Sequence, residues 1–236
     1  MRDYFVEPAQ TNLELYAQAL EADYLPAQRR SLADAYLLAL RSVYPLARGS
    51  GKPFIAHLVG TASLVLASGC PATWVTGALL HALYQRRVPF EGGLVPEQRR
   101  AVVAERFGTV VDDLVLRYTT FESVDLHSVP AEVDEVDRGV LTLRLADELE
   151  DLCGNALALH GDAASDALGV RGGYRRRREA KTRQAPALLD LARRLQLHGI
   201  RYGIERWLDF SSSPEGLADM RTGWLSSVNL TPGGDL

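Results

Sequence analysis

Apolar residues recur at spacings of three and four through almost the whole chain, and this periodicity is the feature that most restricts its fold. Clean alternation over the length of a strand is hard to find. Spacings of three and four place apolar side chains on one face of an α-helix, whereas alternation is typical of a half-buried strand. The sequence therefore predicts an all-α helical bundle with no substantial sheet.

Residues that cap or break helices divide this pattern into separate segments. Pro45 disfavours continuation of the second helix, and Gly108 ends a stretch that begins at Pro96. The last amphipathic stretch is interrupted at Gly199 and Gly203. Helices are predicted over residues 11–21, 31–44, 55–67, 72–84, 96–107, 109–120, 136–152 and 188–208, with loops near 86–95, 121–131 and 154–172.

The first predicted helix carries an apolar stripe. Leu13, Tyr16, Ala17 and Leu20 fall on one face, which we expect to be buried. The chain as a whole shows no internal repeat. We expect an N-terminal helical extension over residues 1–30 packed on the core, a helical domain over 31–209, and a C-terminal turn and loose tail over 210–236.

The composition is that of one globular domain that needs no covalent staples. The chain has 236 residues, of which 47% are hydrophobic and 24% charged, and only two cysteines. No basic-then-apolar leader stands at its start, so we expect a reduced, cytoplasmic protein without a disulfide or a cysteine-based zinc site. The longest apolar stretch, residues 59–66, is too short to span a bilayer, and we expect no membrane insertion.

The charge pattern bears on the choice of partner. The net charge is −4, whereas general nucleic-acid binders carry a basic surface that neutralises phosphates. One exception is the basic run from Arg175 to Arg178, which fits a solvated helix face or the entrance of a pocket for an anion. We expect a small-molecule ligand, for which an anion is one option, rather than nucleic acid.

Three polar residues lie in unusually apolar helical segments. They are His57, His81 and Asp147. A buried imidazole needs partners for its ring nitrogens, and an isolated buried carboxylate is costly. Two imidazoles and one carboxylate that met in one pocket would suit Mn, Fe or Zn. The alternative is that the histidines are separate core residues hydrogen-bonded to the backbone, and spacing alone does not decide between the two.

Four sequence motifs resemble the hydrolase domain of RelA/SpoT-type alarmone enzymes, which belongs to the HD-domain superfamily. Residues 48–57 read RGSGKPFIAH against the family's R-x-S-G-x-P-[YF]-I-x-H, and residues 78–86 read ALLHALYQR against A-L-L-H-D-x-x-E-D. Residues 107–115 resemble F-G-x-x-V-x-x-L-V, and residues 144–151 resemble K-L-A-D-R-L-x-N. Residues 188–205 also resemble the closing helix pair of the family, so the likeness covers roughly residues 31–209 and implies the HD-type helical core.

The resemblance implies a single divalent metal ion, Mn, Fe or Zn, held by His57, His81 and Asp147, which are also the catalytic candidates. Ala82 stands where the family has an aspartate ligand, and this change weakens the expected metal affinity. Gln85 and Arg86 replace the Glu-Asp pair that directs water in the family, which argues against alarmone hydrolysis.

The same resemblance indicates where a substrate would bind. In the family the arginine of the R-x-S-G loop lies against a nucleotide base, which makes Arg48 and Ser50 candidate contacts. Tyr84, Gln85 and Arg86, directly after His81, are the other candidates. The alternative for the loop is a tight connection between two helices with no binding role.

Three functions are consistent with these features. The first is a divergent HD-domain enzyme that acts on a small molecule, for which a phosphorylated one is an option, by a reaction other than alarmone hydrolysis. The second is a non-catalytic nucleotide- or metabolite-binding module. The third is a metal-dependent phosphohydrolase. Nothing in the sequence indicates the oligomeric state.

Overall fold

A computed structural model describes residues 2–48, 52–121, 129, 133–153 and 173–212. In these residues the backbone is helical and forms no strand, and one isolated bridge joins Ala47 and Pro53. The all-α prediction is therefore confirmed. The helices are α1 (Asn12–Glu21), α2 (Pro26–Val43), α3 (Phe54–Ala67), α4 (Ala72–Leu80), the 3₁₀ helix η1 (Glu91–Gly93), α5 (Pro96–Phe107), α6 (Thr109–Phe121), α7 (Glu135–Leu152), α10 (Gly173–Arg194) and α11 (His198–Ser212).

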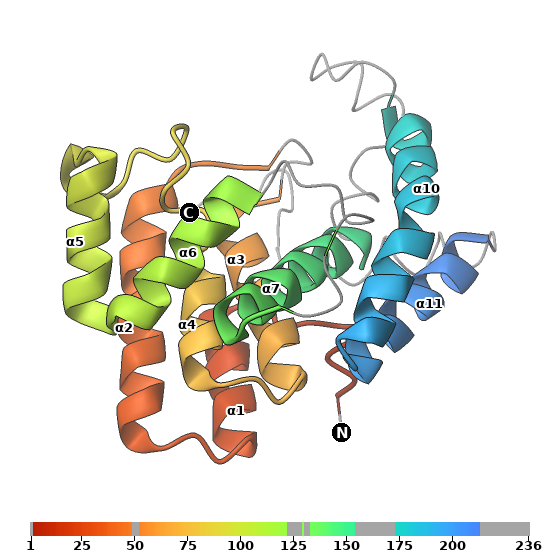
Figure 1. Ribbon diagram of the computed structural model, residues 1–236, viewed down its shortest axis with the longest axis horizontal. Coiled ribbons are helices and arrows are strands. Elements are labelled where there is room, and N and C mark those ends of the chain that lie inside the picture. Colours follow the sequence, from red (N-terminus) through yellow and green to blue (C-terminus); the bar gives the residue numbers. More distant parts are fainter. Residues whose placement is uncertain (1, 49–51, 122–128, 130–132, 154–172, 213–236) are drawn as a thin grey trace, which may run out of the picture.

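The helices pack around α3 and α4, which contact each other along their lengths. Helices α2 and α6 cover α4, and α1 and α7 cover α3. Helix α5 lies at one edge of the bundle against α6, and the pair α10 and α11 lies at the opposite edge against α7 (Figure 1). Helix α7 therefore has the central helices on one side and the C-terminal pair on the other.

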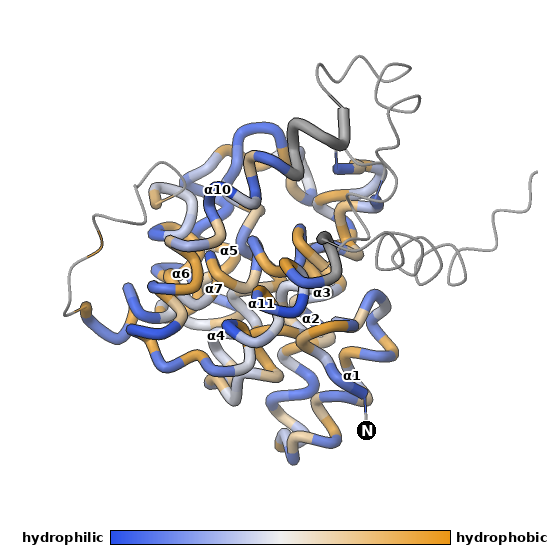
Figure 2. The backbone as a smooth tube through the Cα atoms, turned by 90° about the vertical axis from the view of Figure 1, so that its right-hand side faces the viewer, coloured by the Kyte–Doolittle hydropathy of each residue, from blue (hydrophilic) through white to orange (hydrophobic). Residues whose placement is uncertain are grey.

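The central helices are apolar because they are enclosed on almost all sides. Every residue of α3 from His57 to Leu66 is buried, as is every residue of α4 from Trp74 to Leu80. A helix that is apolar around its whole circumference belongs in a protein core. Hydrophilic and hydrophobic segments alternate along the outer helices instead (Figure 2). No described helix combines the length and the apolar character that a bilayer crossing requires.

Most helix ends lie where the sequence placed them. Helix α5 begins at Pro96 and ends at Phe107 as predicted, with Gly108 at a φ of 91°. Helix α2 begins at Pro26, five residues earlier than predicted, because a proline is well suited to the first turn. It therefore runs across the expected boundary at residue 30. The expected loop 154–172 and residues 213–236 of the expected tail 210–236 lie outside the described residues, whereas residues 210–212 belong to α11 and not to a tail.

The predicted buried stripe of α1 is wrong. Leu13 and Leu20 are 73% and 60% exposed, while Leu15, Gln18 and Ala19 face the core. Gln18 is buried because its amide donates to the carbonyl of Ser63 (2.9 Å) and accepts from the Ser63 hydroxyl (2.7 Å). These paired hydrogen bonds to α3 offset the free-energy cost of removing the Gln18 amide from water.

The predicted interruptions at Gly199 and Gly203 are also wrong, because both residues lie inside α11. The chain breaks earlier, at Gln196, which has a φ of 59°. The two glycines serve close packing: a Cβ on Gly199 would stand 2.1 Å from the ring of Phe5, and one on Gly203 would stand 2.7 Å from Leu149. The N-terminal segment is thereby packed against α11.

Candidate metal site

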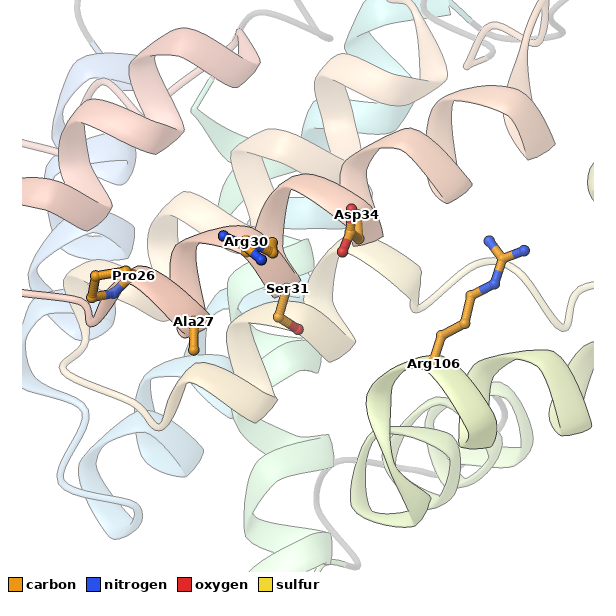
Figure 3. A pocket seen from close by; sticks show the side chains of 6 residues that line it. All are labelled: Pro26, Ala27, Arg30, Ser31, Asp34 and Arg106. Carbon is orange, nitrogen blue, oxygen red and sulfur yellow. The ribbon is translucent and has the colours of Figure 1, made fainter.

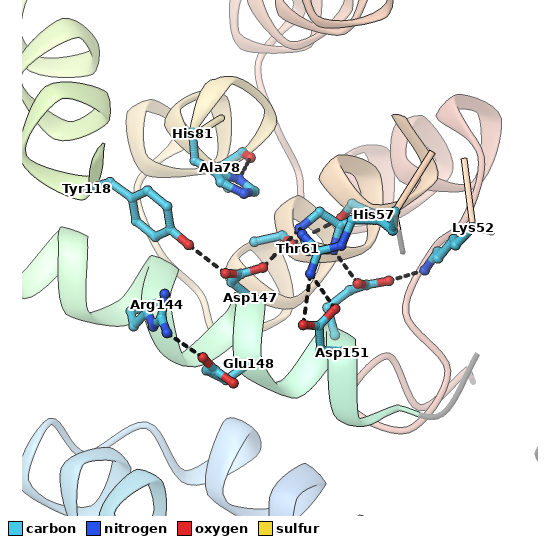
Figure 4. Close-up of polar contacts among 12 residues, drawn as sticks. Lys52, His57, Thr61, Ala78, His81, Tyr118, Arg144, Asp147, Glu148 and Asp151 are labelled. Carbon is cyan, nitrogen blue, oxygen red and sulfur yellow. Dashed lines mark hydrogen bonds and ion pairs between the residues drawn. The ribbon is translucent and has the colours of Figure 1, made fainter. Parts of the chain in front are cut away.

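Side chains from three helices meet at one buried point. His57 comes from α3, His81 follows the last residue of α4, and Asp147 comes from α7. One ligand atom from each lies within 4.8 Å of the other two, and the group could hold a metal ion. The predicted convergence of these three residues is therefore confirmed (Figure 4).

His57 is fully buried and both of its ring nitrogens have polar neighbours. Nδ1 lies 2.5 Å from the Glu150 carboxylate, which can only accept, so Nδ1 carries a proton. Nε2 lies 3.0 Å from Nη1 of Arg48, and a guanidinium can only donate. That contact requires a neutral ring in which Nε2 presents its lone pair, because a protonated ring carries a hydrogen on both nitrogens. A carboxylate that holds Nδ1–H while Nε2 stays open is the usual support of a metal-binding histidine.

Asp147 lies beside the second ring nitrogen of His57, Nε2. Its Oδ1 lies 2.9 Å from Nε2 of His57 but, within the described residues, has no hydrogen-bond partner. While Arg48 donates to Nε2 of His57, this nitrogen acts as an acceptor. It then faces Oδ1 of Asp147, which is also an acceptor, in a buried part of the protein. A cation between or beside them would satisfy both, so the donor set fits a metal ion.

The charge states of the site follow from this crowding. Burial opposes a charged imidazole, but the carboxylates of Glu150 and Asp147 outweigh it and raise the pKa of His57 to about 9. Burial alone would raise the pKa of Asp147, but His57, His81 and Arg48 lower it well below its usual range. A proton, the Arg48 guanidinium and a metal ion therefore compete for the same pair of atoms.

His81 has a simpler environment. Its Nδ1 lies 2.7 Å from the carbonyl oxygen of Ala78, so Nδ1 donates and Nε2 keeps its lone pair. Helix α4 ends at Leu80 rather than at Tyr84 as predicted, and the chain continues in a tighter turn from Leu80 to Leu83. Burial lowers the pKa of His81 to about 4, which keeps it neutral.

Tyr118 on α6 supports both sides of the site and was not predicted. Its hydroxyl donates to Oδ2 of Asp147 (2.6 Å), which turns Oδ1 toward His57. Its ring stands edge-on to His81 at a centroid distance of 4.8 Å. Burial and the Asp147 carboxylate raise the pKa of Tyr118 well above its usual value, so it remains a proton donor. No motif in the sequence marked this residue, since it reaches the site only through the packing of α6.

Further carboxylates of α7 lie beside the ligands. Glu150 pairs with buried Lys52, and together with His57 this lysine lowers the pKa of Glu150 to about 2 against the effect of burial. Gly60 on α3 permits this approach, because a Cβ there would stand 2.7 Å from the Glu150 side chain. His57, Glu150 and Asp151 form a second group whose ligand atoms lie within 4.8 Å. Glu150 and Asp151 stand three and four residues after Asp147 and therefore share its helix face. This spacing could have identified both acids from the sequence.

The candidate substrate-binding residues fall into two sets. Arg48 lies at the metal ligands, while Ser50 is outside the described residues. Tyr84 is buried with its hydroxyl donating to Asp112 (2.7 Å), and Gln85 accepts from Arg87 (3.0 Å). Arg86 is exposed. The described contacts do not join Tyr84, Gln85 or Arg86 to the three ligand residues.

A separate surface pocket lies between α2 and α5 (Figure 3). It shares no residue with the metal site and contains no histidine or cysteine. Its lining residues are Pro26, Ala27, Arg30, Ser31, Asp34 and Arg106. Of the histidines expected to face solvent, His198 is exposed, whereas His127 and His160 lie outside the described residues.

No protein-family model matches this chain, and no curated protein matches it. The resemblance to HD domains therefore remains a prediction that depends on the four motifs.

Proposed function

We propose that this chain is a divergent HD-domain enzyme that binds one divalent metal ion at His57, His81 and Asp147. Its proposed substrate is a small phosphorylated molecule, and the reaction is not alarmone hydrolysis. The observation that carries the proposal is the convergence of three ligand atoms within 4.8 Å, each on a side chain whose other polar atom is already held. Glu150, Ala78 and Tyr118 hold those other atoms. If His57 and His81 were two independent core residues, nothing would require both of them to lie beside the same carboxylate, that of Asp147.

Charge supports a phosphorylated substrate. With the His57 ring neutral, as a metal ion at Nε2 requires, Asp147 and its helix neighbours contribute as many negative charges as the surrounding side chains contribute positive ones. The carboxylates are Asp147, Glu148, Glu150 and Asp151, and the cations are Arg48, Lys52, Arg144 and Lys181. A divalent ion would leave this balanced group with an excess of positive charge, which favours an anion at the site. When bound, the ion supplies Lewis-acid polarisation of a phosphoryl oxygen.

The metal part of this proposal is tested by binding. Elemental analysis of protein purified without added metal, followed by calorimetry with Mn²⁺, should show one ion per chain. His81→Ala should weaken Mn²⁺ binding at least about tenfold, since one of three ligands is lost. Ala82→Asp should strengthen it by supplying a further carboxylate next to His81. Binding that is indifferent to both substitutions in folded protein would refute the metal site.

A non-catalytic binding module is the second candidate, and one observation favours it. Among the described residues, every carboxylate near the ligands is engaged: Glu150 with Lys52, Asp151 with Arg48, and Glu148 with Arg144. None of the three is free to direct water at a substrate.

Turnover separates the two candidates once a ligand has been found by screening phosphorylated metabolites. In an enzyme, His81→Ala should lower kcat far more than it weakens ligand binding, whereas Arg48→Ala should mainly raise KM. Tight, Arg48-dependent binding with no turnover by the wild type would assign the binding module. Full turnover by the His81 variant would exclude the proposed enzyme site.

A further inference from the structure

Arg48 makes contacts that link the metal ligands to a carboxylate outside them. Its Nη1 lies 3.0 Å from Nε2 of His57, and its Nη2 lies 2.7 and 2.8 Å from the two oxygens of Asp151. The guanidinium carbon also lies 5.8 Å from the ring centre of Phe54. The Arg48 side chain is 21% exposed, so this end of the site reaches solvent.

The contact with His57 cannot coexist with a metal on the same nitrogen. A neutral imidazole whose Nδ1 carries the proton has one lone pair on Nε2, directed outward in the ring plane. That lone pair accepts the Arg48 hydrogen bond or binds a metal ion, but not both. When His57 is neutral and no metal is bound, Arg48 therefore acts as an internal cation at the ligand nitrogen.

Loss of the His57 contact does not release Arg48 from the site. The two contacts with Asp151 are made through Nη2, which leaves Nη1 as the group that is displaced. Asp151 itself is held from the other side by Lys181, 3.5 Å away. The guanidinium is then fixed by Asp151 at Nη2, while Nη1 has lost its acceptor. Nη1 therefore presents an N–H in a defined direction next to the metal position. Oxyanions such as phosphate are the ligands that this geometry suits.

We infer that Arg48 couples the two ligands of the site: metal binding displaces Nη1 from His57 and thereby makes this N–H available to an oxyanion beside the metal. The inference rests on the metal site of the proposed function and adds its regulation. Coupling is reciprocal, so an oxyanion that engages Arg48 must also raise the affinity for the metal.

The experiment measures Mn²⁺ affinity by calorimetry and by electron paramagnetic resonance, with and without inorganic phosphate. Arg48→Gln removes the internal cation and should bind Mn²⁺ about fivefold or more tighter than the wild type when phosphate is absent. Phosphate should tighten Mn²⁺ binding by the wild type about fivefold or more and should have no such effect on Arg48→Gln.

Arg87→Gln is the matched control. Arg87 also lies over Phe54, at 5.6 Å, but its described hydrogen bond is with Gln85 and not with His57. This variant loses the same charge and should behave like the wild type in both titrations. Arg48→Lys keeps a cation for Asp151 but lacks the planar fork that contacts two groups at once, so it should bind Mn²⁺ more tightly in a fold that keeps the ion pair.

The outcomes distinguish this inference from the function on which it rests. If Mn²⁺ binding depends on His81 but Arg48→Gln binds no more tightly, or responds to phosphate as the wild type does, the coupling is refuted and the metal site stands. If the wild type shows no His81-dependent Mn²⁺ binding, both are refuted.

Discussion

The two histidines of the site lie with their ring centres only 5.5 Å apart, yet their surroundings are opposite. His57 is surrounded by charged groups, with Glu150, Asp147 and Arg48 at its nitrogens, and its pKa is raised to about 9. His81 has a backbone carbonyl at Nδ1 and an aromatic ring at its edge, and its pKa is lowered to about 4. One side of the site is thus maintained by ion pairs and the other by burial.

This difference shows how the protein divides structural and chemical roles. The charged side includes a lysine and a glutamate that are each 1% exposed, so its groups must remain paired. The neutral side can lose its histidine without leaving a buried charge unpaired. The His57 side should therefore dominate stability, and the His81 side should dominate metal affinity.

The largest effect is expected from Glu150→Ala. This change leaves Lys52 and His57 buried without their shared carboxylate, which should cost roughly 3–5 kcal/mol of the free energy of unfolding. Urea denaturation followed by circular dichroism measures it. Glu148→Ala is the matched control, because Arg144 and Lys181 are about one-fifth exposed and water can replace the lost contact. Equal losses in the two variants would mean that burial of the Lys52–Glu150–His57 group does not set its contribution to stability.

A smaller effect should follow from Tyr118→Phe, which removes one hydroxyl and keeps the ring. Asp147 would lose the bond that directs Oδ1 toward His57, so Mn²⁺ affinity should fall by about 10- to 100-fold, as for other residues that orient metal ligands. Calorimetry with Mn²⁺ measures the change, and the thermal midpoint shows whether the fold persists. Unchanged affinity would mean that Asp147 is oriented by helix α7 alone.

The fold was predictable because packing follows the spacing of apolar residues at most helices. Helix α1 is the exception that shows the limit. Two faces of α1 carry apolar residues, and hydropathy predicts burial of the face with Leu13 and Leu20. The stripe that is buried contains Gln18, whose partner Ser63 is 45 residues away in the sequence. Pairing of two polar groups across helices leaves no periodic signal in either one.

The site was predictable to a similar extent. His57, His81 and Asp147 stand out because each is a polar residue in an apolar helix, and the structure brings them together. Glu150 could have been included from its spacing to Asp147 on α7. Tyr118 could not, since a tyrosine in an amphipathic helix is ordinary and only the packing of α6 against α7 brings its hydroxyl to Asp147.

The smallest effect is expected just beyond His81, where Tyr84→Phe tests whether that segment is structural or binds substrate. Tyr84 donates to Asp112, which also accepts from Arg100 (2.7 Å). Loss of this buried hydrogen bond should cost about 1 kcal/mol of stability at neutral pH and leave Mn²⁺ and phosphate binding unchanged.

The pH dependence of that loss identifies its cause. Burial alone would raise the pKa of Asp112, but the hydrogen bonds from Arg100 and Tyr84 lower it below its ordinary 3.8. A carboxyl with a lowered pKa stabilises the fold above its unfolded value, and this stability is lost as the pH falls through the folded pKa. The difference between wild type and Tyr84→Phe in urea denaturation should therefore be full at pH 7 and shrink below about pH 4. A pH-independent difference would mean that the Tyr84 ring, and not its bond to Asp112, accounts for the loss, whereas weaker phosphate binding by the variant would assign Tyr84 to the substrate.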